Sequence, residues 1–408
     1  MALDPEQFRK KRQERTQQRE AARKKRISRL ILVGLLLITA AVILILVTRP
    51  AAQPGDSQAT VPAQTLPPGE VTTIRIAAVG DLNINDRVVS SGGTVQDYSN
   101  MLLDVSHLLS DPHLTLVNLE GVASGPPYGD SRSTPPEMLQ ALKRIGVDGV
   151  QLANSYTVHN GISSLASTIS ALEEANLMPL GAYRHSGGSK PYIIVNIQGV
   201  RVALVAFTKG TVGMGMLKNG DYGTNILYTD FDTTYQKVDT ARINGILSDV
   251  RNEKPDLVIA MVHWGSEYND NISTSQKKIK DLLQAGGVDA IIGTHPHYVQ
   301  KMELDENGNF IAYSLGDFLG DVPRAGTEYS VILNLTVEKN NKTGVTSITG
   351  FDYVPTFIVN EEEQPLRVVR LREAIAAYEA GQLGRVTQET YEAMKYALTR
   401  VEARVNGK

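Results

Sequence analysis

Five short polar motifs follow apolar, β-branched runs of the sequence, at the points where the strands of a sheet would end. The motifs are Gly80-Asp81, Asn118-Leu119-Glu120, Ala153-Asn154-Ser155-Tyr156, His263-Trp264-Gly265-Ser266-Glu267 and Gly293-Thr294-His295-Pro296-His297. Ligand sites of α/β proteins form where strands end, so we expect these side chains to share one pocket. Carboxylate, amide and imidazole groups that converge in this way can bind a divalent metal ion.

Six side chains make up the predicted metal-ligand set: Asp81, Glu120, Asn154, His263, His295 and His297. His295 and His297 are two positions apart, and in an extended segment both imidazoles would project to the same side. Either both bind one metal ion, or one binds the metal and the other contacts substrate. The chain has no cysteine, which excludes zinc–thiolate sites, disulfides and cysteine nucleophiles.

The elements that would position these motifs are short strands alternating with helices. Strands are predicted at Thr73–Val79, Leu114–Asn118, Gly149–Ala153, Leu257–Val262 and Ala290–Ile292, and helices at Ser163–Ala175 and Ser275–Ala285. Hairpins are predicted within Pro191–Phe207, Val299–Leu315 and Ser330–Phe351, where Gly- and Asn-containing turns separate β-forming runs. Buried strands combined with hairpins predict an α/β fold built as a two-sheet sandwich.

The amino-terminal part differs sharply from the rest in charge. Residues 1–49 hold 12 Lys+Arg and 4 Asp+Glu (net +8), and since the whole chain carries −3, the remainder carries −11. Leu30–Val47 contains no charged residue, which predicts a transmembrane signal-anchor at 30–48. The positive-inside rule then makes 1–29 a cytoplasmic tail and places the remainder outside the membrane. A cleaved signal peptide is the alternative.

Three further segments follow the predicted anchor. Residues 49–70 are rich in Pro, Ala, Gln and Thr and are predicted to form an extended linker. Residues 71–360 form the main domain, and 361–408 are predicted as a helical appendage with helices at Val368–Ala380 and Thr387–Val405. The acidic body argues against a nucleic-acid partner.

Taken in order, the motifs resemble those of the CapA family of capsule (poly-γ-glutamate) synthesis proteins. The similarity includes Gln300 after the His-Pro-His segment, and Tyr313-Ser314-Leu315-Gly316-Asp317-Phe318. The resemblance implies an α/β sandwich of the calcineurin-like metallophosphoesterase type, with a divalent metal ion acting as a Lewis acid. It also implies further site roles. Tyr156, Glu267 and His297, which also belongs to the metal set, would be catalytic, and Asn118, Trp264 and Gln300 would bind substrate.

The sequence departs from that family pattern at two places. Ser155-Tyr156 stand where the family has Asn-His, and Asp317 stands where it has Asn. A tyrosine is a poor proton shuttle at neutral pH, because its unperturbed pKa is about 10. His159 could replace the missing imidazole if the turn brings it round.

Two functions follow from the resemblance. The first is a membrane-anchored extracytoplasmic protein of capsule or poly-γ-glutamate synthesis or export, acting as a metal-dependent hydrolase or transferase on an anionic polymer or its precursor. The second is a non-catalytic component that binds the polymer or membrane proteins of capsule synthesis. A polyanion would need a local basic patch, for which Lys143, Arg144, Lys190 and Lys209 are candidates.

Overall fold

The computed structural model describes residues 69–184, 190–211 and 223–408. The predicted cytoplasmic tail, the anchor at 30–48 and most of the linker at 49–70 therefore lie outside the described residues. Within the described ranges, no helix combines the length and the apolar character needed to cross a bilayer.

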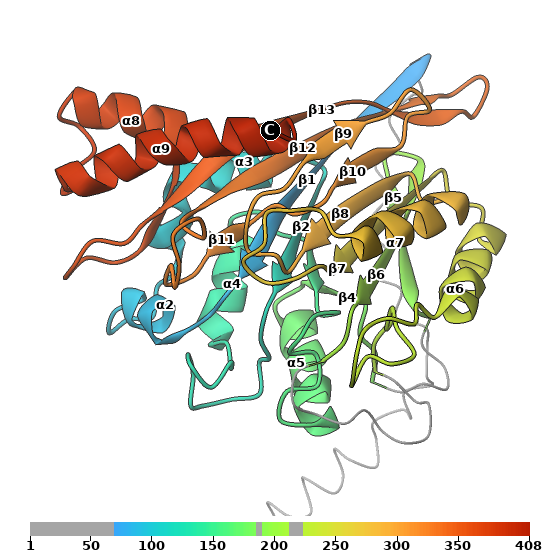
Figure 1. The fold of residues 1–408 in the computed structure, drawn as a ribbon, viewed down its shortest axis with the longest axis horizontal. Coiled ribbons are helices and arrows are strands. Elements are labelled where there is room, and N and C mark those ends of the chain that lie inside the picture. Colours follow the sequence, from blue (N-terminus) through green and yellow to red (C-terminus); the bar gives the residue numbers. More distant parts are fainter. Residues whose placement is uncertain (1–68, 185–189, 212–222) are drawn as a thin grey trace, which may run out of the picture. The chain divides into compact units, whose positions relative to one another are not determined.

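The larger of two mixed sheets has the strand order β14-β13-β12-β1-β2-β3-β4, with β11 paired to the end of β1 (Figure 1). Its parallel strands are β1 (Val71–Leu82), β2 (Leu114–Leu119), β3 (Gly149–Gln151), β4 (Met178–Leu180) and β11 (Asp317–Leu319). Its antiparallel strands are β12 (Tyr329–Asn340), β13 (Thr346–Val359) and β14 (Arg367–Arg370). The first strand of the domain is thus central in its sheet.

The second sheet has the order β5-β6-β7-β8-β10-β9. Its parallel strands are β6 (Val200–Thr208), β7 (Leu257–His263), β8 (Ala290–Thr294) and β10 (Phe310–Ala312). The edge strands β5 (Tyr192–Ile197) and β9 (Met302–Leu304) run antiparallel to their neighbours. Every residue of β7 and β8 is buried, as expected for parallel strands that are covered on both faces.

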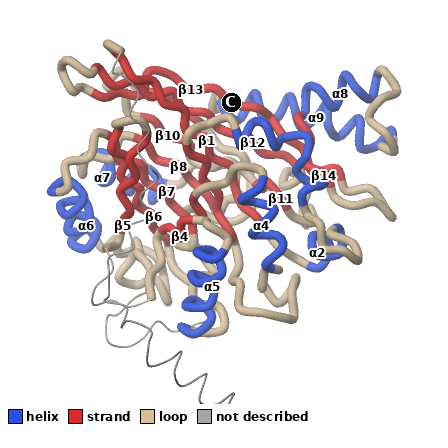
Figure 2. Tube along the Cα trace, turned by 180° about the vertical axis from the view of Figure 1, so that it is seen from behind, coloured by secondary structure: helices blue, strands red, loops and turns tan. Residues whose placement is uncertain are grey.

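The two sheets pack face to face and share one hydrophobic core. Side chains from β1, such as Ile74 and Ile76, belong to the same buried cluster as Leu204 of β6 and Ile259 of β7. The outer face of the larger sheet is covered by α2 (Asp86–Ser91), the 3₁₀ helix η1 (Ser99–Val105), α3 (Ser106–Ser110), α4 (Pro136–Arg144) and α5 (Ile162–Glu174) (Figure 2). The outer face of the second sheet is covered by α6 (Thr240–Asn252) and α7 (Thr274–Ala285). The predicted two-sheet α/β sandwich is confirmed.

The predicted hairpins are also present. Gln198 and Gly199, between β5 and β6, have φ angles of 52° and 88°. Two successive left-handed residues are the signature of the tight turn that suits the twist of paired strands. The hairpins β9–β10 and β12–β13 complete the set.

The carboxyl-terminal segment differs from its prediction at one point. Helices α8 (Leu371–Glu379) and α9 (Gln388–Val405) lie where helices were expected, but the first of them begins three residues late. Residues 368–370 belong instead to β14, which pairs with β13. The helices then pack on β12 and β13, and Met394 and Val401 of α9 join the core between the sheets. The last 48 residues therefore contribute both a strand and core side chains to the sandwich.

Candidate metal centre

Two rows of neighbouring residues cross the carboxyl ends of the sheets. In the larger sheet, Asn118, Asp81 and Asp317 lie side by side, because Asp81 is in register with Asn118 of β2 and with Asp317 of β11. In the second sheet, Thr208, His263 and Thr294 form an equivalent row. A hydrogen bond joins the two rows: the backbone amide of His295 donates to Asp81 Oδ2 at 3.0 Å. Pairing register in both sheets therefore determines which side chains meet.

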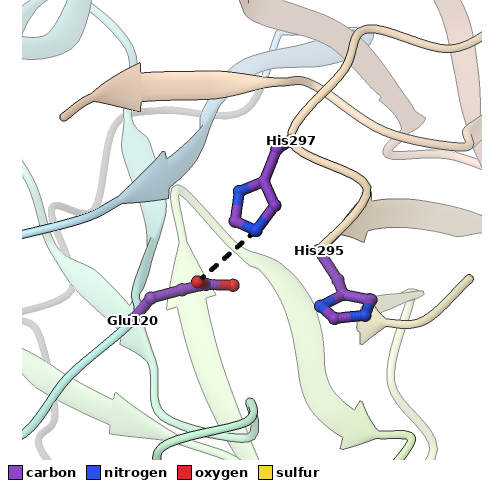
Figure 3. Close-up of side chains that lie close together, drawn as sticks. All are labelled: Glu120, His295 and His297. Carbon is purple, nitrogen blue, oxygen red and sulfur yellow. Dashed lines mark ion pairs between the residues drawn. The ribbon is translucent and has the colours of Figure 1, made fainter. Parts of the chain in front are cut away.

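Carboxylates gather on the side of the centre formed by the larger sheet. We call Asp81, Glu120 and Asp317, together with His297, the acid side. His297 Nδ1 lies 2.7 Å from Asp317 Oδ1 and 3.7 Å from Asp81 Oδ2. His297 Nε2 lies 4.0 Å from Glu120 Oε2 (Figure 3). One imidazole thus faces all three acids.

Two imidazole rings, a hydroxyl group and an amino group gather on the side of the centre formed by the second sheet. We call His263 and His295, with Ser155 and Lys209, the imidazole side. Ser155 Oγ lies 3.1 Å from His263 Nε2. Lys209 Nζ lies 3.3 Å from His295 Nε2 and donates to Gly265 O at 3.0 Å. The rings of the two histidines are 4.4 Å apart between centroids.

The backbone carrying His295 and His297 is not extended, contrary to the expectation from their spacing. Both residues have positive φ angles, 93° and 61°. Such conformations are unfavourable for residues with a side chain and cluster at functional sites, where the surrounding structure enforces them. The two imidazoles nevertheless belong to one group of candidate ligands with Glu120, and their ring centroids are 6.1 Å apart.

Two glycines allow the strands to approach closely at the centre. A Cβ atom on Gly80 would lie 1.8 Å from Gly316 O, and one on Gly293 would lie 2.0 Å from Tyr313 O. Neither distance is compatible with a side chain. Gly80 therefore lets β11 come alongside β1, which brings Asp317 next to Asp81.

Burial controls the protonation of the acid side. Burial raises the pKa of Asp81 to about 6, although the nearby His297 opposes the shift. Burial also raises the pKa of Glu120 well above its usual range, and the charge of Asp81 adds to the effect. Burial alone would lower the pKa of His297, but the charges of Asp317 and Glu120 outweigh it and raise the pKa well above 6.5. The acid side therefore holds a proton on His297 at neutral pH.

The two histidines of the imidazole side are shifted toward their unprotonated forms. Burial lowers the pKa of His263 well below 6.5, and the positive potential of His295 and His297 adds to that effect. Burial and then Lys209 lower the pKa of His295 in the same way. Both rings are therefore neutral at pH 7 and carry a lone pair that can bind a metal ion.

The donor set fits a divalent metal ion. Three groups of side chains have ligand atoms within 4.8 Å of one another: Glu120, His295 and His297; Asp81, Glu120 and His263; and Asp81, His297 and Asp317. Glu120 Oε1 is buried and has no hydrogen-bond partner among the described residues, which is costly for a carboxylate oxygen unless a cation binds it. Mixed oxygen and nitrogen ligands suit Zn²⁺, Mn²⁺ or Fe²⁺ rather than the all-oxygen shell typical of Ca²⁺.

Two predicted residues support the acids. Asn118 Nδ2 donates to Asp81 Oδ1 at 2.7 Å. Asn154 Nδ2 donates to Asn118 Oδ1 at 3.1 Å and to the carbonyl of Leu119. Asn118 is fully buried behind Asp81, so it holds that carboxylate rather than presenting a surface to substrate. Asn154 also binds the backbone amide of Tyr156 through Oδ1.

The predicted catalytic residues outside the metal set lie around the centre. Tyr156 is half-buried beneath the guanidinium group of Arg132, which lies 4.5 Å from the ring centroid. Burial raises the pKa of Tyr156, so its hydroxyl stays protonated and can donate a hydrogen bond. Glu267 is exposed and lines a cavity of about 220 Å³ together with Ser155, Lys209 and His295. His159 lies against the edge of the Tyr156 ring, 5.8 Å between centroids.

Two predicted substrate-binding residues lie in the protein interior. Trp264 has no exposed surface, and its indole nitrogen donates to Tyr313 O at 2.9 Å. Gln300 is 2% exposed and bridges Gln276 and the carbonyl of Asn269. These hydrogen bonds tie Trp264 to the residue that follows β10 and Gln300 to α7, and neither residue lines the cavity.

The structure adds cationic and aromatic groups that sequence reasoning did not place at the centre. Arg324 lies over the ring of Tyr268, which stacks on His297 at 5.1 Å between centroids. Arg132 covers Tyr156 from the loop after β2. Neither arginine follows a strand directly, so no local signal could have found them.

Only one member of the suggested basic patch lies at the centre. Lys209 follows β6, and its position at a strand end was the signal that could have singled it out. Lys143 instead pairs with Asp148, Arg144 with Asp97, and Lys190 with Glu253.

Comparison with known proteins agrees with the motif pattern. Residues 75–322 match the family model described as bacterial capsule synthesis protein PGA_cap. The chain is 29% identical to the capsule biosynthesis protein CapA of Bacillus anthracis, over 57% of this chain and 53% of that protein. It is 27% identical to the PGA biosynthesis protein CapA of Bacillus subtilis, over 54% of each. The chain thus spans about half the length of these curated relatives.

Among solved structures, the chain is similar to the calcineurin-like phosphoesterase YfkN from Bacillus subtilis. The TM-score is 0.42 at 16% sequence identity, over 80% of this chain and 99% of that one.

Proposed function

Because the chain belongs to the PGA_cap family of bacterial capsule synthesis proteins, we propose that it acts as a metal-dependent hydrolase or transferase on an anionic capsule polymer, such as poly-γ-glutamate, or on its precursor. One observation carries the proposal. Three carboxylates and three imidazoles from both sheets meet in a single buried cluster whose geometry suits a divalent cation.

Asp81, Glu120 and the three histidines would hold the metal ion, with Asn154 near them. A divalent ion in this place supplies a Lewis acid for a phosphoryl or carbonyl oxygen of the substrate. Asn118 fixes the orientation of Asp81, and Asp317 fixes that of His297. Such supporting hydrogen bonds keep ligands in position and tune their basicity.

The cavity beside His295 is the proposed substrate pocket. Lys209 provides a positive charge on its wall, and Ser155 and Ser266 provide hydroxyl groups. A phosphoryl or carboxylate group of the substrate can accept hydrogen bonds from these donors. Tyr156, kept protonated by burial, can donate a hydrogen bond to a leaving-group oxygen.

The second candidate is a non-catalytic component that binds the polymer or membrane proteins of capsule synthesis. The observation that favours it is Tyr156, because a group that remains protonated at neutral pH is a poor shuttle for a proton. In this case the centre would bind polymer through the metal ion without cleaving it.

The cellular setting is part of the proposal. The uncharged run at 30–48 would anchor the chain, with 1–29 in the cytoplasm, 49–70 as a spacer and the described domain outside. The substrate and the membrane proteins of capsule synthesis would then be met at the outer surface.

The test uses purified full-length protein. Elemental analysis should find a divalent metal at a stoichiometry of one or two, lost in His295→Ala and kept in His113→Ala, whose imidazole lies away from the centre beside Arg75. The metal-loaded protein should cleave bis(p-nitrophenyl) phosphate or shorten poly-γ-glutamate. Metal-free protein would overturn the proposal, whereas bound metal without turnover of either substrate would favour the binding component.

A further inference from the structure

A second cavity, of about 340 Å³, lies between the loop after β2 and the beginning of α5. It shares no lining residue with the metal centre. Six serines line it: Ser124, Ser131, Ser133, Ser163, Ser164 and Ser167. Its volume falls within the range of small-molecule sites, about 300–1,000 Å³.

Helix α5 begins in this cavity without a cap. Its N-cap residue is Gly161, which has a φ angle of 93° and offers no side chain, and its first turn contains no acidic residue. The described residues provide no acceptor for the backbone amides of Ile162, Ser163 and Ser164. A helix start of this kind presents N–H groups and a partial positive charge to any ligand in front of it.

A buried hydroxyl group is a second, independent observation that indicates a ligand in the cavity. Ser164 lines the cavity but is only 4% exposed. Its Oγ atom makes no hydrogen bond within the described part of the chain. Buried hydroxyl groups are normally paired, so this one indicates a partner supplied from the cavity. The hydroxyl of Ser133 is already used, since it donates to Gly125 O at 2.6 Å.

We infer that this cavity binds a phosphate group, free or carried on a small molecule. The open amides of α5 and the hydroxyls of Ser163, Ser164 and Ser167 supply donors, and no carboxylate side chain is among the described residues that line the cavity. Uncapped helix starts bind phosphate in this way. The site stands on its own contacts and does not depend on the proposed function of the metal centre.

The experiment is calorimetric titration of the full-length protein with inorganic phosphate and, separately, with glycerol phosphate, in the presence of EDTA. One site is expected, and the ligand that binds more tightly identifies the source. Ser163→Asp places a carboxylate in the first turn, which favours the helix but repels the anion. The affinity of the Ser163→Asp variant for phosphate should be at least about tenfold lower than that of wild type. Ser164→Ala should weaken binding less, without lowering the melting temperature.

The matched control is Ala241→Asp. This change puts the same residue at the same position of α6, a helix that Asp239 already caps, and it should leave phosphate affinity unchanged. The inference is wrong if neither ligand binds the wild-type protein, or if Ser163→Asp binds as tightly as wild type. It is equally overturned if binding survives Ser163→Asp but is lost in Lys209→Met, because the phosphate would then lie at the metal centre.

Discussion

The carboxyl groups of the acid side and the two histidines of the imidazole side are almost fully buried, yet burial shifts their pKa values in opposite directions. Asp81 and Glu120 are pushed toward their protonated forms, and His297 takes up a proton among them. His263 and His295 are pushed toward their neutral forms. The acid side thus combines carboxyl groups with a protonated imidazole, whereas the imidazole side offers two neutral rings with lone pairs.

The two sides therefore depend on pH with opposite signs in the metal-free protein. The pKa of Asp81 is raised from 3.8 to about 6, so its contribution to stability is complete below pH 3.8 and is lost as the pH rises through 6. The pKa of His295 is lowered, so its contribution is present above pH 6.5 and is lost as the pH falls below that value. A bound divalent cation would satisfy both sides at once.

The largest expected effect comes from Asp81→Asn. Removing the charge should lower metal affinity at least about 100-fold. The same change should stabilise the metal-free protein at pH 8, because it removes the cost of keeping a buried carboxylate ionised. The gain should be less than about 3 kcal/mol, since one amide cannot accept both of the hydrogen bonds that Asn118 and His295 donate to Asp81. Chelator competition measures the first quantity and denaturant unfolding the second.

Asp289→Asn is the control for that pair of measurements. Asp289 is another carboxylate whose pKa is raised by burial, but it binds the amide of Val258 at the opposite end of β8. The metal affinity of the Asp289→Asn variant should equal that of wild type. Equal metal affinity in Asp81→Asn and wild type would contradict the assignment of Asp81.

A smaller effect is expected from Asp317→Asn. Asp317 raises the pKa of His297, and a protonated His297 competes with the metal ion. The substitution should move the pH at which metal binding is half-complete downward by about one unit. Metal titrations between pH 5 and 9 test this, and an unchanged midpoint would show that His297 does not compete.

On the imidazole side, Lys209→Met should leave metal affinity at pH 8 unchanged but should alter the stability of the metal-free protein. Lys209 is the second cause, after burial, of the lowered pKa of His295. Without it, protonation of His295 costs less, so the metal-free protein should be more stable at pH 5 by about 1 kcal/mol. Unfolding curves at pH 5 and pH 8 separate this result from a general change in packing.

The smallest effect on the centre is expected from Trp264→Phe. The change leaves Tyr313 O without its donor and should lower the free energy of unfolding by about 1–2 kcal/mol. Metal affinity should not change. A loss of metal affinity together with unchanged stability would place Trp264 at the site after all.

The ends of the strands could be predicted from the sequence, and the side chains that meet at the centre could be predicted from those strand ends. Asp81, Glu120, His263 and His295 each follow a run of β-branched residues, and parallel strands bring such ends together. The strand at 367–370 was not predictable, because its four residues acquire β structure only by pairing with β13. Local periodicity there resembles that of the helix that follows.

The contacts that depend on the conformation of the turns after the strands could not be predicted from the sequence. The left-handed conformations of His295 and His297 depend on hydrogen bonds and packing from the opposite sheet, such as the bond to Asp81. Trp264 shares a motif with Glu267, yet one side chain points into the core and the other to the surface. A motif identifies a strand end but does not fix the direction of each side chain after it.

The contact between the end of β1 and the turn after β8 has a consequence for the order of events during synthesis. Asp81 emerges among the first residues of the domain, and its partner His295 is 214 positions later, with Asp317 still further on. A nascent chain that ends before His295 has only part of the proposed ligand set. Binding of a metal ion at the proposed centre would therefore come late, after most of the domain has been made, and would require that the two sheets have already come together.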